Sequence, residues 1–438
     1  MSSFQTEYSQ KLQTADEAVS IIPSGTDVSM GMALGEPPAL LAALAKRLTV
    51  GEVGGVRLWY FHSMPSAAET VLRYELMDRL HPHCMFMGPI ERALEAQGEK
   101  DGRKVVNFVP VAFSDAPRLL SAHVELDTFI TTVSPMDKHG YFTFAANNDY
   151  ATTAARAAKR TIVEVNPNLP RVFGDSTLHI SEVDAVIENK RDLFEIPARD
   201  ATPAETKIGE TIAEMVKDGA CLQMGIGALP NAVCKHLENR SDLGIHTELL
   251  SPGMVDLIQA GAVTNRRKAT FPGRSVFTFA LGNQAMYDLL DDNPSINSHP
   301  VNIVNDPRHI AKNPDFVSIN ATLQIDLFGA CNSETLKGRQ YSGSGGQLDF
   351  VRGARASKGG RSIIACPSTA KGGVSRIVPT LTGPVTTPRN DVDTVVTEYG
   401  AVRLIGLSGQ ERASAMISLA HPDHRAELEA AARKLLLL

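Results

Sequence analysis

The strongest constraint on the fold is an internal repeat, because segments of the first half of the chain recur in the second half in the same order. Three pairs of segments correspond: 25–31 with 219–225, 149–167 with 349–367, and 182–187 with 391–396. Strand–glycine–helix units recur in any α/β protein, but three matches in one order favour a duplication. The sequence therefore predicts two copies of one structural unit.

Both halves alternate between strand-like and helix-like patterns. Short runs rich in β-branched residues, 161–165 and 394–397, predict buried strands. Helices are predicted at 39–48, 204–216 and 411–417. This alternation is typical of parallel sheets with helical crossovers. We therefore expect two similar open α/β domains with mostly parallel sheets, residues 1–190 and 191–438, linked near the prolines of 190–204 and with the active site between them.

Composition and charge argue against several classes of function. The chain is 43% hydrophobic and 21% charged, which is typical of a soluble globular protein. Its net charge of −6 argues against nucleic acid as a partner. No secretory signal and no apolar run of about 18 residues is visible, so we expect a cytoplasmic protein without a membrane span. The five cysteines are scattered and never spaced C-x-x-C, so the sequence predicts neither a metal site nor a disulfide framework.

A glycine-rich segment in the second half is a candidate for ligand binding. Gly225 and Gly227 follow a predicted strand and open a helix, where backbone N–H groups favour a negative charge. The dinucleotide fingerprint needs a third glycine where Pro230 stands, which disfavours NAD. A tight structural turn explains the same glycines equally well.

A second glycine loop and one glutamate complete the candidates. Gly343, Gly345 and Gly346 could present successive N–H groups to an oxyanion or a thioester carbonyl, although a flexible hairpin is equally consistent. Glu248 ends the apolar segment GIHTELL and would be an ordinary surface glutamate unless it faces a cleft. These patterns alone predict a duplicated α/β enzyme with glycine loops.

A positive stretch follows the second loop. Its basic residues could contact the phosphates of coenzyme A, or simply form a solvated helix face: Arg352, Arg355, Lys358 and Arg361. The pattern does not decide between these interpretations.

Longer segments carry a more specific signal. They are VSPMDKHGYFTFAANNDY (133–150), EVNPNLPRVFGDSTLHISEVD (164–184), MGIGALPNAV (224–233), GIHTELLSPGMVDLIQAGAVTN (244–265), SINATLQIDLFG (318–329), YSGSGGQLDFVRGA (341–354) and VTEYGAVRLIG (396–406). Together they resemble the acetyl-CoA hydrolase/transferase family of class I CoA-transferases, most closely its 4-hydroxybutyrate CoA-transferase type. The resemblance covers nearly the whole chain.

The resemblance implies a covalent mechanism on Glu248, since the glutamate of the G-I-H-[ST]-E segment is the nucleophile in such proteins. A carboxylate attacks the thioester and gives an acyl–glutamyl anhydride and CoA thiolate, without a metal. The thiolate then attacks the glutamyl carbonyl and leaves a glutamyl–CoA thioester, and an incoming carboxylate reverses the sequence. We expect Glu248 to be ionised near neutral pH, so that no general base is needed.

The resemblance also implies the rest of the site. Asn320 and the backbone of the Gly343–Gly346 loop are expected to stabilise negative charge on a carbonyl oxygen. Gly225 and Gly227 are expected to lie beside the thioester or the pantetheine. Coenzyme A is then a substrate rather than a permanently bound cofactor, and acyl-CoA and small carboxylic acids are the partners. Family members form homo-oligomers, so we expect a homodimer or a homotetramer.

Three alternatives stay open. A dicarboxylate such as succinate or itaconate could replace 4-hydroxybutyrate, acetate or butyrate as the substrate, and an arginine facing the acyl pocket would favour it. A hydrolase would use the same anhydride with water as the final acceptor. A non-catalytic ligand sensor could share the α/β unit, but Glu248, Asn320 and the glycine loop together argue against it.

Overall fold

The computed structural model describes residues 3–197 and 199–438, which form two compact units. The first unit comprises Met1–Ile196 and Thr278–Ile303, and the second Pro197–Phe277 and Val304–Leu438. Thr278–Ile303 belongs to the first unit although it falls within the predicted domain 191–438. Its strand β16 (Ile296–Ser298) pairs in parallel with β8 (Phe173–Gly174). The division at residue 190 stays a prediction.

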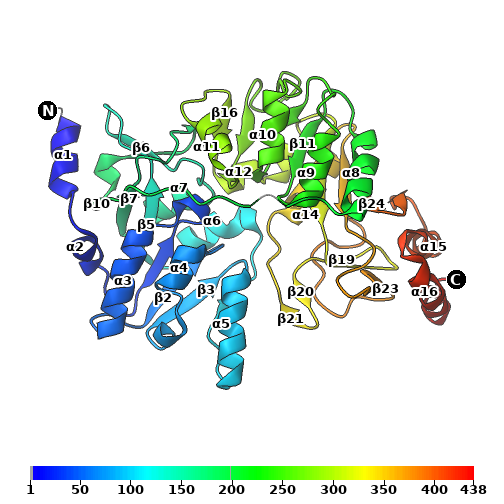
Figure 1. Ribbon diagram of the computed structural model, residues 1–438, viewed down its shortest axis with the longest axis horizontal. Helices are drawn as coiled ribbons and strands as arrows, with labels where there is room; N and C mark the ends of the chain where they lie inside the picture. Colours follow the sequence, from blue (N-terminus) through cyan, green and yellow to red (C-terminus); the bar gives the residue numbers. More distant parts are fainter. Residues whose placement is uncertain (1–2, 198) are drawn as a thin grey trace. The chain divides into compact units, whose positions relative to one another are not determined.

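The first unit is built on a seven-stranded sheet in which every strand pair is parallel (Figure 1). The strand order is β10 (Ala185–Glu188), β7 (Arg160–Val165), β5 (Leu126–Val133), β1 (Asp27–Met30), β2 (Val56–Tyr60), β3 (Leu80–Cys84) and β4 (Asn107–Phe108). The central strand β5 reads LDTFITTV and is buried along its whole length, as expected where helices cover both faces of a parallel sheet. The predicted strand 161–165 is confirmed within β7.

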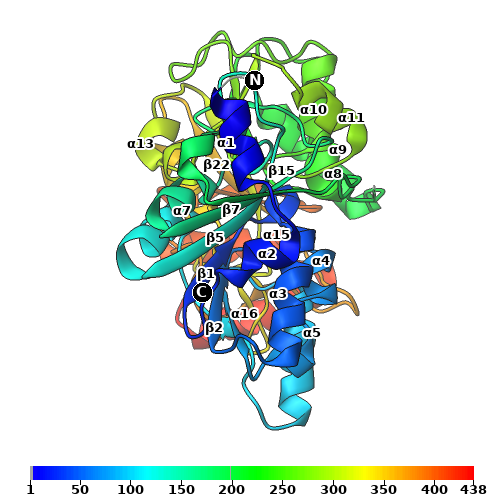
Figure 2. The ribbon, with the colours of Figure 1, turned by 90° about the vertical axis from the view of Figure 1, so that its left-hand side faces the viewer.

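Helices cover both faces of this sheet (Figure 2). On one face lie α2 (Ala15–Ser20), α3 (Pro38–Val50) and α5 (Pro89–Lys100), and on the other lies α7 (Ala151–Ala157). Leucines recur along the buried side of α3, Pro38 begins its first turn, and Gly51 ends it with a φ of 79°. The predicted helix 39–48 is thereby confirmed. The unit also contains α1 (Ser3–Lys11), α4 (Pro65–Glu69), α6 (Ala116–Arg118), α11 (Gln284–Leu290), β6 (Tyr141–Thr143) and β9 (Thr177–His179).

The second unit is built on a six-stranded sheet with one antiparallel edge. Its strand order is β12 (Gly244–Ile245), β11 (Cys221–Met224), β17 (Phe316–Ala321), β22 (Arg361–Ala365), β24 (Thr394–Thr397) and β25 (Gly400–Arg403). The pairs from β12 to β24 are parallel, and β25 runs antiparallel to β24. The predicted strand 394–397 is confirmed as β24. Fold class is therefore as predicted: α/β with mostly parallel sheets.

The two sheets repeat one strand order, which agrees with the repeat in the sequence. Strands β1, β7 and β10 of the first unit occupy the places that β11, β22 and β24 occupy in the second. These are the strands that hold the matching segments 25–31 and 219–225, 149–167 and 349–367, and 182–187 and 391–396.

The helices and short strands of the second unit surround its sheet. The helices are α8 (Pro203–Met215), α9 (Ala228–Lys235), α10 (Pro252–Gln259), α13 (Pro307–Ile310), α14 (Gln347–Ala356), α15 (Gly409–Leu419) and α16 (Pro422–Lys434). The shorter strands include β14 (Ser275–Phe277), β18 (Gln324–Asp326), β19 (Cys331–Asn332), β20 (Thr335–Leu336), β21 (Arg339–Gln340) and β23 (Ile377–Val378). The predicted helices 204–216 and 411–417 are confirmed as α8 and α15. Within residues 3–197 and 199–438, no helix combines the length and apolar character needed to cross a membrane.

Candidate active site

The candidate residues gather at the carboxyl edge of the parallel sheet in the second unit. Glu248 follows β12, Gly225 and Gly227 follow β11, and Asn320 lies at the end of β17. Thr247 ties the first two strand ends together, because its Oγ1 donates a hydrogen bond to the carbonyl oxygen of Met224 at 3.3 Å. Ligands of open α/β sheets bind at this edge, where neighbouring strand ends splay apart.

The short strand that leads to Glu248 is held by buried side chains. Ile245 donates its N–H to Asn265 Oδ1 at 2.9 Å, and its carbonyl oxygen accepts from Lys268 Nζ at 2.7 Å. Lys268 is only 5% exposed, and burial lowers the pKa of its ammonium to about 8. Nε2 of buried His246 contacts the carbonyl oxygen of Val304 at 2.7 Å. These bonds fix the backbone just before Glu248.

The Glu248 carboxylate is half-buried and held by two donors. Asn305 Nδ2 donates to Glu248 Oε2 at 2.6 Å, and the backbone N–H of Gly346, at the N-terminus of α14, donates to the same carboxylate. Burial raises the pKa of Glu248 to about 7, and the charge of Asp349 adds to the rise, while the two donors oppose it. Burial thus opposes the ionisation that the sequence analysis expects near neutral pH, and that expectation stays a prediction.

Of the three glycines in the second loop, Gly346 makes the contact with Glu248. A Cβ atom at Gly346 would lie well under 3.0 Å from Glu248 Oε2 and from Asn305 Nδ2. Gly343 is buried, and Gly345 has a φ of 56°, a left-handed conformation that favours glycine. These two glycines shape the loop that brings Gly346 to the carboxylate.

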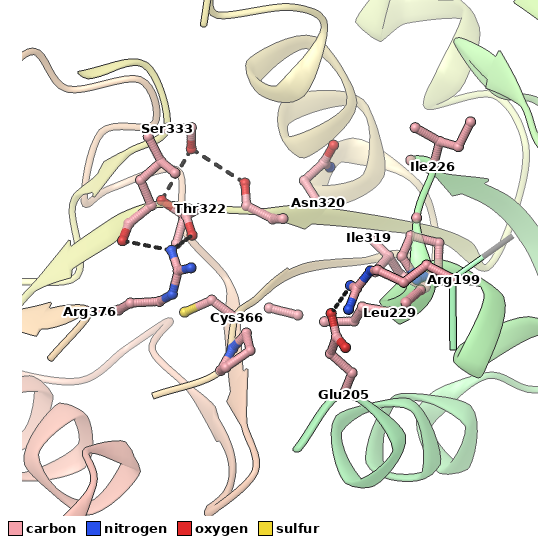
Figure 3. Close-up of a pocket in the computed structure, with 18 residues that line it drawn as sticks. Arg199, Glu205, Ile226, Leu229, Ile319, Asn320, Thr322, Ser333, Cys366 and Arg376 are labelled. Carbon is pink, nitrogen blue, oxygen red and sulfur yellow. Dashed lines mark hydrogen bonds and ion pairs between the residues drawn. The ribbon is translucent and has the colours of Figure 1, made fainter. Parts of the chain in front are cut away.

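Beside these strand ends lies a cavity of about 420 Å³ (Figure 3). Gly225, Gly227 and Asn320 line it together, and a Cβ atom at either glycine would meet nothing within 4 Å. Its apolar walls include Ile226, Leu229, Ile319 and Leu323. At one side Arg199 pairs with Glu205 at 2.6 Å, and at the other Arg376 faces the cavity (Figure 3). Glu248 is not a lining residue of this cavity, although its strand neighbours the strand that ends in Gly225.

Asn320 has a partner that the sequence did not reveal. Gln223 Nε2 donates to Asn320 Oδ1 at 3.3 Å, and Asn320 Nδ2 donates to Gln223 Oε1 at 3.2 Å. Gln223 is 4% exposed and lies on β11 between Leu222 and Met224, which are fully buried. A polar residue inside a buried strand, two residues before a glycine turn, was the available signal. Asn305 was also missed, and its sequence context carries no comparable signal.

The raised pKa of Glu248 predicts an acidic limb in the pH profile. Only the ionised carboxylate is nucleophilic, so acylation by butyryl-CoA should rise with pH and level off above about pH 7. Below that pH the rate should fall about tenfold per unit. Rapid-quench measurement of the first turnover between pH 5 and 9 checks this. A limb near the ordinary value of 4.5 would contradict the burial of the carboxylate.

The described part of the chain contains no group of three or more His, Cys, Asp or Glu side chains arranged to hold a metal ion. All five cysteines are free and buried.

Comparison with known proteins identifies the relatives of this chain. A family model described as acetyl-CoA hydrolase/transferase N-terminal domain matches residues 1–196, and the model of the corresponding C-terminal domain matches residues 282–432. The succinyl-CoA:cyclohexane-1-carboxylate CoA transferase of Geobacter metallireducens is 45% identical over 99% of this chain and 97% of its own length. The 4-hydroxybutyrate coenzyme A transferase of Clostridium kluyveri is 41% identical over 96% and 97%.

Solved structures agree with these relatives. RipA from Yersinia pestis is 59% identical, with a TM-score of 0.97 over 99% of this chain and 100% of that one. The 4-hydroxybutyrate CoA-transferase from Porphyromonas gingivalis is 34% identical, with a TM-score of 0.84 over 98% and 99%.

Proposed function

This chain belongs to the acetyl-CoA hydrolase/transferase family, and three of the relatives named above are CoA-transferases by name. We therefore propose that it moves coenzyme A between an acyl-CoA and a short-chain carboxylic acid through covalent intermediates on Glu248. One observation carries the proposal: a half-buried carboxylate at the carboxyl edge of a parallel sheet, bound by Asn305 Nδ2 at 2.6 Å and by the N–H of Gly346. Substrates of the 4-hydroxybutyrate, acetate or butyrate type are supported by the names of the relatives.

The reaction begins when an oxygen of Glu248 attacks the thioester carbonyl. The C–S bond breaks, and the products are the acyl–glutamyl anhydride and CoA thiolate. The thiolate then attacks the glutamyl carbonyl, the anhydride C–O bond to the acid breaks, and the donor acid leaves. The resulting glutamyl–CoA thioester is attacked by the acceptor carboxylate, and the same steps in reverse give the new acyl-CoA. Each turnover regenerates the Glu248 carboxylate.

The donors around Glu248 have a role in each half-reaction. When the thiolate attacks the glutamyl carbonyl, negative charge develops on the oxygen that Asn305 and Gly346 already hold, so these fixed donors stabilise it. The amide of Asn320 is fixed by Gln223. We propose that Asn320 stabilises the negative charge that develops on the acyl carbonyl oxygen when Glu248 attacks it. Gly225 and Gly227 leave room for the thioester beside the cavity.

A second candidate substrate class is a dicarboxylate such as succinate or itaconate, and Arg376 favours it. This arginine lines the cavity and donates through Nη1 to the carbonyl oxygens of Thr322 and Leu323, at 3.4 and 3.2 Å. Its Nη2 makes no hydrogen bond within the part of the chain that the structure describes. The guanidinium thus retains donor capacity for a second carboxylate.

The choice between mono- and dicarboxylates can be tested at Arg376. If a succinyl group is bound there, Arg376→Met should lower kcat/KM for succinyl-CoA roughly tenfold relative to butyryl-CoA, because a charge-assisted hydrogen bond is lost from one substrate only. The ratio of kcat/KM for succinyl-CoA to kcat/KM for butyryl-CoA is taken within each protein, so a loss of folded enzyme affects both values equally. An equal loss with both donors would assign Arg376 a purely structural role.

Transfer and hydrolysis differ in the fate of coenzyme A. A transferase keeps the thioester until an acceptor acid arrives, so incubation with butyryl-CoA alone should release at most one equivalent of butyrate per active site, while coenzyme A stays on the enzyme as the glutamyl–CoA thioester. Addition of acetate should then give acetyl-CoA in amounts equal to the butyrate formed. Continuous release of free CoA without an acceptor would instead support the acyl-CoA hydrolase. If neither butyrate nor CoA is released and no acetyl-CoA forms, the result would support the non-catalytic ligand sensor.

We also propose a cellular location and an oligomeric state for this protein. Five free, buried thiols fit a reducing compartment such as the cytoplasm. A homodimer or a homotetramer is proposed by analogy with the family, and the molar mass in solution tests it.

A further inference from the structure

Two strands in the sheet of the first unit are fully buried on one face only. Strands β2 and β3 read VRLWY and LHPHC, and buried side chains alternate with more exposed ones along both. Val56, Leu58 and Tyr60 of β2 are fully buried in the core under the helices of one face. Helices normally cover both faces of a parallel sheet, and its strands then read as continuous apolar runs, as β5 does. The alternation in β2 and β3 therefore predicts that a further layer of protein covers their second face.

This second face crosses four neighbouring strands on the side of β2 away from α3 and α5 (Figure 2). Residues that pair in register on parallel strands point to the same side, so the pairing identifies its members. We call it the β1–β4 face, and its members are Asp27, Arg57, Trp59, His81, His83 and Asn107. Arg57 and Asn107 are exposed, and both histidines and Trp59 are half-buried.

Trp59, the only tryptophan of the chain, lies at the centre of this face. Its Nε1 donates a hydrogen bond to Asp27 Oδ1 at 2.7 Å. Its ring lies against the imidazole of His83, with ring centroids 4.5 Å apart and an interplanar angle of 32°. The side chain is thus fixed and its polar atom has a partner, while part of the ring remains open. Tryptophan in such a position is typical of the centre of a protein interface.

Apart from its imidazoles, the β1–β4 face carries two charges, and they cancel. Arg57 Nε donates to Asp27 Oδ1 at 2.6 Å, and Arg57 Nη2 contacts the same carboxylate. Burial lowers the pKa of His83, so its ring is neutral at pH 7. Two copies of a chain with a net charge of −6 repel each other unless they meet where no net charge lies. A strongly charged partner finds no complementary potential here, whereas a second copy meets a face as neutral as its own.

We propose that the β1–β4 face is a contact surface between two copies of this chain, with Trp59 at its centre. The proposal rests on the homo-oligomer included in the proposed function, and it assigns the face at which the copies meet. Closed homo-oligomers most often contain two-fold axes, across which both copies bury the same face. Val109 and Val111 extend the contact, because they stay half-buried while packing against the same core cluster as Trp59.

Charge substitutions on the β1–β4 face test the proposal through the molar mass in solution. Asn107→Glu and His81→Glu each place a carboxylate on the face of both copies, so each should raise the dissociation constant about tenfold or more. Near the dissociation constant of the unaltered protein, the molar mass from sedimentation should then fall toward half. Ala93→Glu adds the same charge at an exposed position of α5, on the opposite side of the sheet, and should leave the molar mass unchanged. Thermal unfolding shows that each variant is folded.

Tryptophan fluorescence localises the contact, because Trp59 is its only source. When the unaltered protein is diluted, the emission should shift to longer wavelength and acrylamide quenching should increase over the range in which the molar mass halves. Asn107→Glu should show the shifted emission at higher concentrations than the unaltered protein does. An unchanged molar mass in both glutamate variants, or constant emission while the oligomer dissociates, would overturn the assignment.

The outcome is independent of catalysis, since sedimentation needs no turnover. Dissociation of the two glutamate variants but not of Ala93→Glu supports the face whether or not the protein transfers coenzyme A. A monomer at every concentration of the unaltered protein would reject the face and the homo-oligomer together. Failure of CoA transfer in an intact oligomer would instead reject the proposed transferase activity.

Discussion

Replacing Glu248 with alanine is expected to abolish CoA transfer, with a loss of roughly 10⁴-fold or more, as for other covalent nucleophiles. No other carboxylate of the described site is held by both Asn305 and Gly346, so a substitute nucleophile is not at hand. The fold should persist, because the variant removes a half-buried group whose ionisation is disfavoured by burial. Transfer assays and thermal unfolding of the same preparation measure both effects.

A graded control is available at the same position. Glu248→Asp keeps a carboxylate but withdraws it by one methylene group from Asn305 and Gly346. A displacement of this size costs about 10²-fold in rate when it disturbs the reacting geometry. Near-normal turnover in the alanine variant would reject Glu248 as the nucleophile.

Gly346→Ala is expected to cause the second largest loss, about 10²-fold in the rate of acylation. The added Cβ atom would collide with Glu248 Oε2 and Asn305 Nδ2, so the carboxylate and its donor must separate. The φ of −99° at Gly346 is open to alanine, which makes the effect a steric one on the carboxylate rather than backbone strain. Single-turnover acylation by butyryl-CoA measures the loss.

Gly409→Ala is the matched control for this substitution. Gly409 also lies at the beginning of a helix, α15, and its Cβ atom would make only an ordinary contact, 3.5 Å from a methyl group of Leu437. This variant should keep full activity and be at least as stable, since alanine is the better helix former. If Gly346→Ala were as active as Gly409→Ala, the contact between the loop and Glu248 would have no catalytic role.

Much of the fold could be predicted because it follows from local patterns. The β-branched runs 161–165 and 394–397 favour buried strands, and they lie in β7 and β24. Alternation with helices such as α3 favours mostly parallel sheets. The strand order was not predicted, but equivalent strands occupy equivalent places in the two sheets, as a duplication implies. The membership of Thr278–Ile303 in the first unit was not foreseeable, since short strands such as β8 and β16 pair across a long sequence separation.

The site was less predictable because it depends on partners distant in sequence. Asn305 lies 57 positions after Glu248, and Gln223 lies 97 positions before Asn320, so neither pairing leaves a local pattern. The pKa of Glu248 depends on burial and on Asp349, which a sequence does not show. Glycine spacing singled out the loop that reaches Glu248, but only the packing against Glu248 distinguishes Gly346 from Gly343 and Gly345.

Mass spectrometry of the peptide that contains Glu248 tests the central claim most directly. The protein is incubated with butyryl-CoA without an acceptor acid, treated with borohydride or hydroxylamine, and digested. A modification at Glu248 is expected that is absent from Glu248→Ala and that disappears when acetate is added before trapping, as acetyl-CoA forms. Turnover with an unmodified Glu248 peptide, or with a modification on another residue, would contradict it.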